Sequence, residues 1–423
     1  MEQKKNYTLP IIMMFALFFM ISFVTGLQNP MGVIVKDQFG ASNLLSQLGN
    51  FANFIAYAFM GIPAGLMLKR IGYKKTALAA VVVGFLGVAV QYLSGVTESF
   101  TVYLIGAFIA GFSMCMLNTV VNPMLNTLGG GGNKGNQLIQ FGGSVNSMGA
   151  TIVPVLGGYL MGSSKTIAAA APALYLAMGI FALTFIVLYF THIPEPFVST
   201  KESKKDGHSA LSFRHFILGA VGIFIYVGVE VGIPNIGNLY MTAAPSTGGL
   251  GISEAVAGTV VGAYWLLMLC GRFIGGMVGA KVSSRAMLIF VSSLGVILIM
   301  LAMFLPAVGV MMPAFDQDTL SFTLTEVPVN VVMLVLCGFC TSVMWGGIFN
   351  LAVEGLGKYT SMGAGFFMVM VCGGGVLPAI QGGIADSFGF MNSYWVIVAG
   401  MIYLLYYAIA GSKNVNKNIP VNE

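Results

Sequence analysis

Long apolar segments, each able to cross a lipid bilayer as a helix, follow one another along this chain. A helix that spans a bilayer needs about 20 mostly apolar residues. Only 8% of the residues are charged and 57% are hydrophobic, whereas a soluble domain carries about 25% charged residues. The pattern predicts an all-α membrane protein with twelve transmembrane helices, at residues 8–35, 46–69, 75–95, 99–123, 136–162, 168–192, 214–240, 254–280, 285–312, 328–353, 360–384 and 390–411.

A polar break after the sixth span divides the chain into two six-helix halves. The break, IPEPFVSTKESKKDGHSALSF, is charged and turn-rich, so we expect a linker there. GIPAGLMLKRIGYKK (61–75) and GRFIGGMVGAKVSSR (271–285) occupy the same point in each half, and both place glycines before a cationic turn. Such pairs indicate an internal repeat of the kind found in transporters. The expected parts are an N-terminal half at 1–192, a cytoplasmic linker at 193–213, a C-terminal half at 214–411 and a cytoplasmic tail at 412–423.

The lysines and arginines predict the orientation of the chain in the membrane. With the N-terminus inside, sixteen of the nineteen fall on the cytoplasmic side, which agrees with the positive-inside rule. Lys36 and Lys165 fall outside, and Arg272 lies within a span. The first span has no small-residue cleavage site and is too long for a signal peptide, so we expect it to be retained. Both termini are therefore expected in the cytoplasm.

Two charged residues, Glu230 and Arg272, lie well inside predicted spans. A charge at the centre of a bilayer costs at least about 2.5–3.5 kcal/mol, so it usually faces a cavity or a partner. Burial favours the neutral form of a carboxyl group, and a carboxyl that takes up and releases protons near neutral pH is what a proton-coupled transporter requires. We therefore predict that Glu230 couples transport to protons. A structural ion pair or hydrogen bond is the alternative role for Glu230, and for Arg272 the roles considered are structural pairing and binding of an anionic substrate.

Amides and aromatic residues recur on several spans and suit a neutral, hydroxyl-rich ligand. Asn118 and Asn122 are four residues apart and share a helix face, and Gln47, Asn50, Asn53 and Tyr57 form a polar stripe down the second span. Amides bond hydroxyl groups and aromatic faces pack on sugar rings, although each amide could instead bond a neighbouring helix. The predicted substrate-binding set is Asn118, Asn122, Asn146, Gln28, Asn29, Asn53, Tyr57, Tyr226, Asn235 and Trp345.

Two further motifs do not indicate catalysis or metal binding. The glycine-rich LGGGGNKG (128–135) lacks the G-K-[ST] ending of a phosphate-binding loop and follows no strand. Cys337 and Cys340 lie in an apolar helix, and the five cysteines show no disulfide or zinc spacing. We expect neither an enzyme nor a nucleic-acid partner, and neither a cofactor nor a bound metal.

Several segments resemble the L-fucose:proton symporter family of the major facilitator superfamily. The resemblance covers most of the chain, in order, and is carried by LNTVVNPMLNTLG (117–129), NSMGA (146–150), IYVGVEV (225–231), GRFIGG (271–276), SVMWGGIFNLAVEGLG (342–357) and GGGVLPAIQGGIADSFG (373–389). It implies a major facilitator fold and a bacterial inner-membrane sugar importer that is driven by the proton gradient and works by alternating access. It also implies that Asn146 is a sugar ligand.

This sequence departs from the fucose transporter at its proton-coupling positions. Asn118 stands where that transporter has a glutamate, and an apolar residue near Val33 replaces its aspartate. Glucose/galactose-type relatives carry a glutamate in the same Y-V-G-x-E setting as Glu230. The resemblance therefore implies that the proton site has moved to Glu230, which argues against L-fucose itself as the substrate.

The expected function is a proton-coupled importer, acting as a monomer, for a hexose, an N-acetylated amino sugar or sialic acid. Three alternatives are considered, of which a membrane enzyme or sensor would need a catalytic constellation or a soluble output domain, and the sequence indicates neither. A sodium-coupled importer would use amides and carbonyls to bind the ion. An exporter of drugs or metabolites from the same superfamily would have a more apolar cavity with fewer amides.

Overall fold

The computed structural model describes residues 7–128, 132–161, 166–168, 170–193, 208–278, 282–306, 308–316, 321–356, 359–416, 418–419 and 421. Among these residues, eleven helical segments are long and apolar enough to cross a membrane. A further helix of 30 residues, Gly132–Met161, has spanning length. The twelve predicted spans thus each correspond to a helical segment.

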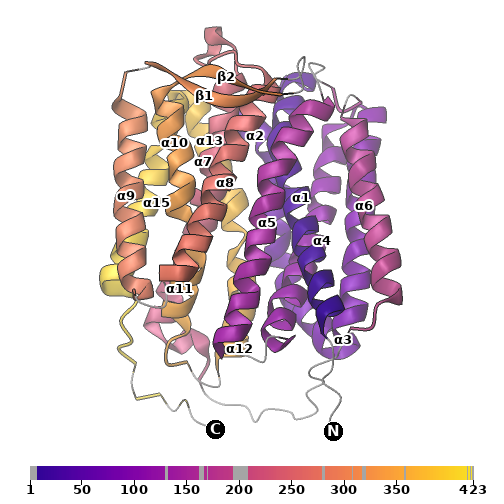
Figure 1. Cartoon of the computed structure of the whole chain (residues 1–423), viewed down its shortest axis with the longest axis vertical. Helices are drawn as coiled ribbons and strands as arrows, with labels where there is room; N and C mark the ends of the chain where they lie inside the picture. Colours follow the sequence, from indigo (N-terminus) through magenta and orange to yellow (C-terminus); the bar gives the residue numbers. More distant parts are fainter. Residues whose placement is uncertain are drawn as a thin grey trace.

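Six spans form the N-terminal part of the molecule. In Figure 1 they lie together on one side, in indigo to magenta. The elements are α1 (Thr8–Gln38), the short α2 (Asn43–Ser46), α3 (Leu48–Val96), α4 (Phe100–Leu128), α5 (Gly132–Met161) and α6 (Ala171–Phe190).

The remaining elements lie on the other side of the molecule, in pink through orange to yellow (Figure 1). They are η1 (Ala210–Ser212), α7 (Arg214–Thr242), η2 (Pro245–Thr247), α8 (Glu254–Val278), α9 (Ser284–Phe304), β1 (Gly309–Asp316), β2 (Ser321–Pro328), α10 (Val329–Thr341), α11 (Met344–Val353), α12 (Thr360–Met370), α13 (Gly373–Phe388), α14 (Phe390–Ser393), α15 (Trp395–Tyr406) and the π-helical η4 (Tyr407–Gly411). Most of the expected linker, residues 194–207, lies outside the described residues.

The second and third spans are two helices within α3 that meet at a sharp turn at Gly72. This residue has φ 84° and ψ 175°, a conformation that glycine adopts without the steric penalty of a side chain. The two spans on either side of the turn are Leu48–Leu68 and Arg70–Val96. The glycine and the cationic residues of the first repeat segment therefore mark the reversal of the chain between the second and third spans.

The prediction of a helix over 285–312 was wrong at its C-terminal end. Helix α9 ends at Phe304, and the apolar residues that follow form strand β1, which pairs antiparallel with β2. Pro306 disfavours the helical conformation of the residue before it, which explains why the apolar run leaves the helix. The resulting hairpin covers the end of the molecule opposite the start of α1 and the end of η4 (Figure 1).

The tenth and eleventh spans are each interrupted near their middle. Between α10 and α11 the chain turns at Ser342 and Val343, and between α12 and α13 it turns at Val371 and Cys372. All four residues keep right-handed helical backbone angles, so each span is kinked at this point and not unwound. Both interruptions lie in the C-terminal part.

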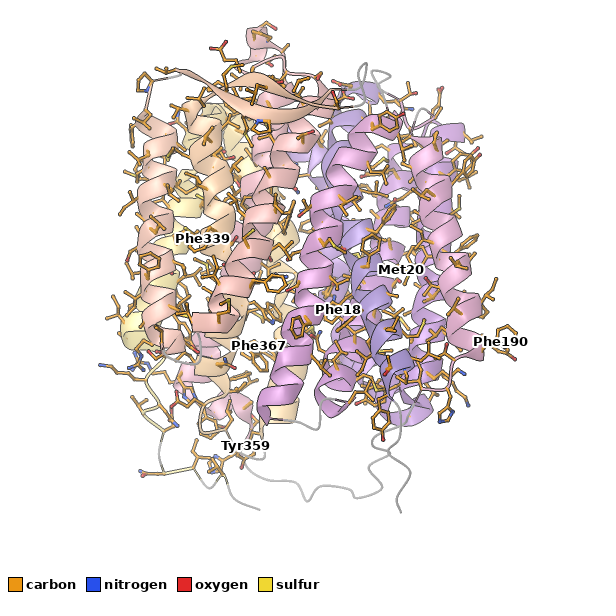
Figure 2. The ribbon with its side chains drawn as sticks, in the orientation of Figure 1. Phe18, Met20, Phe190, Phe339, Tyr359 and Phe367 are labelled. Atoms are coloured by element: carbon orange, nitrogen blue, oxygen red, sulfur yellow. The ribbon has the colours of Figure 1, made fainter. Side chains whose placement is uncertain are left out.

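Apolar side chains cover the outside of the helices as well as their interior. Phe190 is 80% exposed and projects away from the bundle (Figure 2). Lipid solvates such side chains, so the outer surface is that of a protein immersed in a bilayer. The two parts meet where α5 packs on α8 and where α3 packs on α12 and α13.

Candidate functional site

The carboxylate of Glu230 and the guanidinium of Arg272 form an ion pair inside the bundle. Glu230 Oε1 lies 3.5 Å from Arg272 Nη2, and the two side chains are 14% and 15% exposed. The residues come from α7 and α8, both in the C-terminal part. Glu230 is therefore not an isolated carboxylate, because a cation from the next helix faces it.

Arg272 also connects the two parts of the molecule. Its Nη1 donates to the backbone oxygen of Gly143 at 2.7 Å and to Ser147 Oγ at 2.7 Å. Both acceptors lie on α5, in the N-terminal part. One guanidinium thus contacts a titratable carboxylate on its own side of the interface and two neutral oxygens on the other side.

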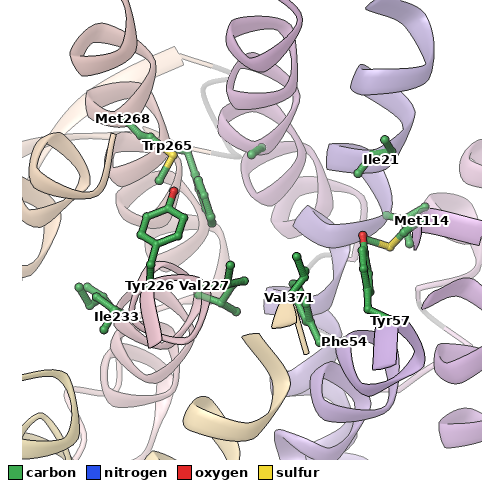
Figure 3. Close-up of a cluster of buried hydrophobic side chains, with 14 of the residues drawn as sticks. Ile21, Phe54, Tyr57, Met114, Tyr226, Val227, Ile233, Trp265, Met268 and Val371 are labelled. Carbon is green, nitrogen blue, oxygen red and sulfur yellow. The ribbon is translucent and has the colours of Figure 1, made fainter. Parts of the chain in front are cut away.

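Aromatic residues surround this ion pair. Tyr226 is 1% exposed, and its ring centroid lies 6.3 Å from that of Trp345. The Tyr226 hydroxyl lies close to both Glu230 and Arg272. Tyr264 donates to the backbone oxygen of Glu230 at 3.0 Å, which fixes α8 against α7 at this level. Figure 3 shows Tyr226 beside Trp265 and Met268.

In the N-terminal part, α4 presents two of the predicted amides. Asn118 Nδ2 donates to the Tyr57 hydroxyl at 2.9 Å and to the backbone oxygen of Met114 at 3.1 Å. Asn122 Nδ2 donates to the backbone oxygen of Asn118 at 2.9 Å. Both asparagines are partly exposed inside a spanning helix. Tyr57 lies beside Met114 in Figure 3.

The side-chain amides of Asn146 and Asn53 differ in their hydrogen-bond partners. Asn146 Nδ2 donates to the backbone oxygen of Phe18 at 3.0 Å, so it joins α5 to α1. Asn53 is fully buried on α3, and neither end of its amide has a hydrogen-bond partner among the described residues. The side chains of Gln28 and Asn29 lie outside the described ones, although α1 includes both positions.

The structure separates Asn235 from Glu230. The two residues are five positions apart, so they lie about 140° apart around α7. Asn235 Nδ2 donates instead to Gln47 Oε1 at 3.3 Å, across the interface between the two parts. Two neighbouring amides that the predicted set omitted, Asn50 and Gln381, are also buried there. The polar stripe on the second span pointed to Asn50, whereas a single glutamine in GVLPAIQGG gave no periodic signal for Gln381.

The described residues contain no cluster of three or more His, Cys, Asp or Glu side chains that could hold a metal ion. Cys337 and Cys340 are buried and unbridged in α10. The chemistry of the site therefore lies in the ion pair, the amides and the aromatic rings.

Comparisons with known proteins agree with the fold and with the resemblance. A model of the Major Facilitator Superfamily matches residues 14–379. A glucose/galactose transporter of Brucella abortus biovar 1 (strain 9-941) is 29% identical over 422 residues, which cover 98% of this chain and 96% of that protein. An L-fucose-proton symporter of Escherichia coli (strain K12) is 22% identical over 415 residues, 92% of this chain and 89% of that protein.

Among solved structures, the crystal structure of the Escherichia coli fucose:proton symporter has a TM-score of 0.69 at 20% identity, and covers 97% of this chain and 100% of that chain. The similar proteins are transporters, not enzymes, and the family match extends over most of the twelve spans. The chain therefore belongs to the Major Facilitator Superfamily.

Proposed function

We propose that this protein is a proton-coupled importer of a neutral hexose. The observation that carries the proposal is the arrangement at Arg272, which pairs with Glu230 in one half and bonds α5 in the other. The similarity to a glucose/galactose transporter and to an L-fucose-proton symporter supports both the sugar and the proton.

Protonation of Glu230 changes the electrostatic partner of Arg272. With the carboxylate ionised, the guanidinium lies between that charge and the α5 oxygens. When Glu230 takes up a proton, its attraction for Arg272 weakens. The guanidinium of Arg272 is then held less by Glu230 in its own half and relatively more by the α5 oxygens in the other half. In alternating access the halves rock about a site between them, so this link makes the rocking depend on the proton.

The amides and aromatic rings supply the sugar contacts. An amide offers both donors and an acceptor to hydroxyl groups, and Asn118, Asn122 and Asn146 lie on helices that face the interface. Tyr226 and Trp345 offer ring faces. Because Arg272 is already occupied by Glu230 and α5, a neutral sugar suits the site better than sialic acid, and the amides favour a sugar over the apolar substrates of an exporter.

The proposed location is the bacterial cytoplasmic membrane, with both termini in the cytoplasm. Arg70, Lys74, Lys75, Arg214 and Arg285 flank spans at the end where α1 begins and η4 ends, as the positive-inside rule requires. The ion pair and its α5 contacts come from one chain, so a monomer is sufficient for the mechanism.

External pH in lightly buffered, de-energised cells tests the coupling and the substrate together. Glucose, galactose, fucose, N-acetylglucosamine, N-acetylmannosamine and sialic acid are added in turn. Alkalinisation with the neutral hexoses supports the proposal. No response to any sugar from confirmed membrane protein contradicts it, and uptake that follows a sodium gradient instead would show sodium coupling.

Substitution of the coupling carboxylate provides the first specific prediction. Glu230→Gln should retain sugar exchange between equal concentrations but lose accumulation against a gradient, because the side chain no longer releases a proton. The matched control is Glu354→Gln, which changes an exposed carboxylate at the end of α11 and should leave accumulation unchanged. Full accumulation by the Glu230 variant would rule out its role.

A further inference from the structure

Four buried amides meet between the ion pair and the hairpin end of the molecule. They are Gln47 and Asn50 of the N-terminal half and Asn235 and Gln381 of the C-terminal half, all at most 5% exposed. Asn235 donates to Gln47 at 3.3 Å, and Asn50 donates to the backbone oxygen of Gly374 at 2.7 Å. We call these four residues the outer amide cluster.

Gln381 is the member of this cluster whose buried amide lacks hydrogen-bond partners within the described part of the chain. It is fully buried, and among the described residues neither Nε2 nor Oε1 has a hydrogen-bond partner. Its Oε1 lies over Gly232, where an added Cβ would be 2.7 Å away. Gly232 is three positions before Asn235 and therefore shares its face of α7. The amide of Gln381 thus packs against the same face of α7 that presents Asn235.

Asn50 is also incompletely satisfied, because its Oδ1 has no partner among the described residues. A buried amide that lacks partners loses its hydration without compensation, whereas leucine would fill the same space without that loss. Two such amides at one interface indicate that their polar groups are used in another conformation of the protein.

The contacts at the hairpin end show that this interface is closed in the present conformation. Asp386, at the end of α13, accepts from the backbone N–H groups of Asn43 and Leu44, both at 2.8 Å. An added Cβ at Gly382 would lie 2.8 Å from the backbone oxygen of Asn43 and 3.3 Å from Gln47 Cγ. Alternating access requires the halves to part here, and the parting would expose the outer amide cluster to a ligand entering from this end.

We propose that the outer amide cluster is an entry subsite for the sugar, distinct from the residues around Glu230 and Arg272. The inference rests on the proposed function. The four side chains are uncharged and together carry donors and acceptors from both halves, which matches the hydroxyl groups of a neutral sugar. In the closed conformation Asn235 donates to Gln47 and Asn50 donates to the backbone oxygen of Gly374, and in the open one all four amides bond the sugar.

The test measures apparent affinity separately from the two faces of the membrane. Gln381→Leu is assayed for uptake into right-side-out vesicles and inside-out vesicles, with the hexose that the wild type transports. The expected result is a rise of about five- to tenfold in KM at the hairpin face, the loss that one or two hydrogen bonds would give. The expected KM at the opposite face is within twofold of the wild type, and the proton stoichiometry is unchanged.

Monodeoxy analogues of the sugar separate a contact from a structural effect. If Gln381 bonds a hydroxyl group, one analogue should bind the wild type and the Gln381→Leu variant with nearly equal KM. Gln381→Met repeats the measurement with a flexible side chain of similar length in case the leucine variant does not fold. Gln91→Leu is the matched control, since Gln91 is a 3% exposed amide that packs against Gly106 within the N-terminal half.

The outcomes are distinct. A face-specific rise in KM that disappears for one deoxy analogue supports the subsite. Equal changes at both faces, equal changes for every analogue, or no change in either Gln381 variant would overturn it while wild-type transport upholds the proposed function. If the wild-type protein transports no hexose, both the entry subsite and the proposed function are wrong.

Discussion

At the scale of single residues, Arg272 holds the contacts that matter most for the proposed mechanism. Three hydrogen-bond acceptors, on two helices from different halves, face its guanidinium. A planar guanidinium can serve several acceptors at fixed angles, whereas the ammonium of lysine is a compact charge on a flexible stem. The identity of this residue, and not only its charge, is therefore expected to matter.

Arg272→Lys should reduce uptake about tenfold or more, because lysine cannot reproduce the contacts to both halves. Arg272→Gln should be worse, since it leaves the Glu230 carboxylate buried without a cation, and the double variant with Glu230→Gln should recover exchange. Uptake and exchange are measured side by side. Arg285→Lys, at a 3.3 Å contact to Ser412, is the control, and wild-type uptake by Arg272→Lys would contradict the argument.

Tyr57→Phe tests the amide pair in the N-terminal half. The change removes the hydroxyl that accepts from Asn118 at 2.9 Å, so that amide keeps its bond to the Met114 backbone oxygen but loses the one to α3. We expect a two- to tenfold rise in sugar KM, about 0.5–1.5 kcal/mol, with proton coupling intact. Tyr175→Phe removes an exposed hydroxyl that donates to the Tyr92 hydroxyl at 2.7 Å, and it should have no effect. A loss of coupling in Tyr57→Phe would contradict this assignment.

At the scale of elements, close helix contacts within each half keep the site rigid. Helices α3 and α4 approach through glycine, because an added Cβ at Gly111 would overlap the backbone oxygen of Asn53 and lie 2.7 Å from the Cβ of Ala56. Small residues allow such approach in membranes, where packing replaces the hydrophobic effect between helices. Since Asn53 precedes Tyr57 by one turn, this contact also positions the amide site.

Gly111→Ala should destabilise the protein by about 1–3 kcal/mol, the usual penalty for overpacking. The expected readout is a lower apparent melting temperature in detergent. Gly179→Ala on α6 is the matched control, since no atom lies within 4 Å of its added Cβ, and it should melt at the wild-type temperature or above. Equal melting temperatures of the two variants would mean that α3 and α4 can move apart without a loss of stability.

At the scale of the whole molecule, the hairpin end is held shut by contacts between the halves. The carboxylate of Asp386 accepts two backbone N–H groups at the start of α2, where a negative charge is favourable. Lys36 of α1 also lies 5.7 Å from the ring centroid of Phe390. These contacts must break each time the protein opens toward this side.

Asp386→Asn should shift the population toward the conformation that is open at the hairpin end. Charge-assisted hydrogen bonds are about twice as strong as neutral ones, so the variant weakens the closed form without removing the side chain. Spin labels at the exposed Glu98 and Thr247, with Cys270 and Cys372 replaced, report the separation by pulsed EPR. Ser387→Ala is the control. An unchanged distance distribution would show that Asp386 does not control closure.

The number of spans, their order and the separation into halves followed from the sequence alone. A lipid bilayer requires long apolar helices. Each span can therefore be recognised from about 20 consecutive residues without knowledge of the rest of the chain. The same local evidence identified Glu230 and Arg272, because a charge within such a stretch is conspicuous. It failed at residues 305–312, where apolar composition cannot distinguish a strand from the end of a helix.

Tertiary structure decided which of these residues meet. No spacing relates Glu230 to Arg272, or Arg272 to Gly143 and Ser147, because each contact joins two different helices. The same holds for Asn235 and Gln47, and for Gln381, whose lack of partners among the described residues is visible only once α13 is packed on α7. A membrane sequence determines its helices through local hydrophobicity, whereas the site depends on side-chain contacts between helices that local hydrophobicity does not specify.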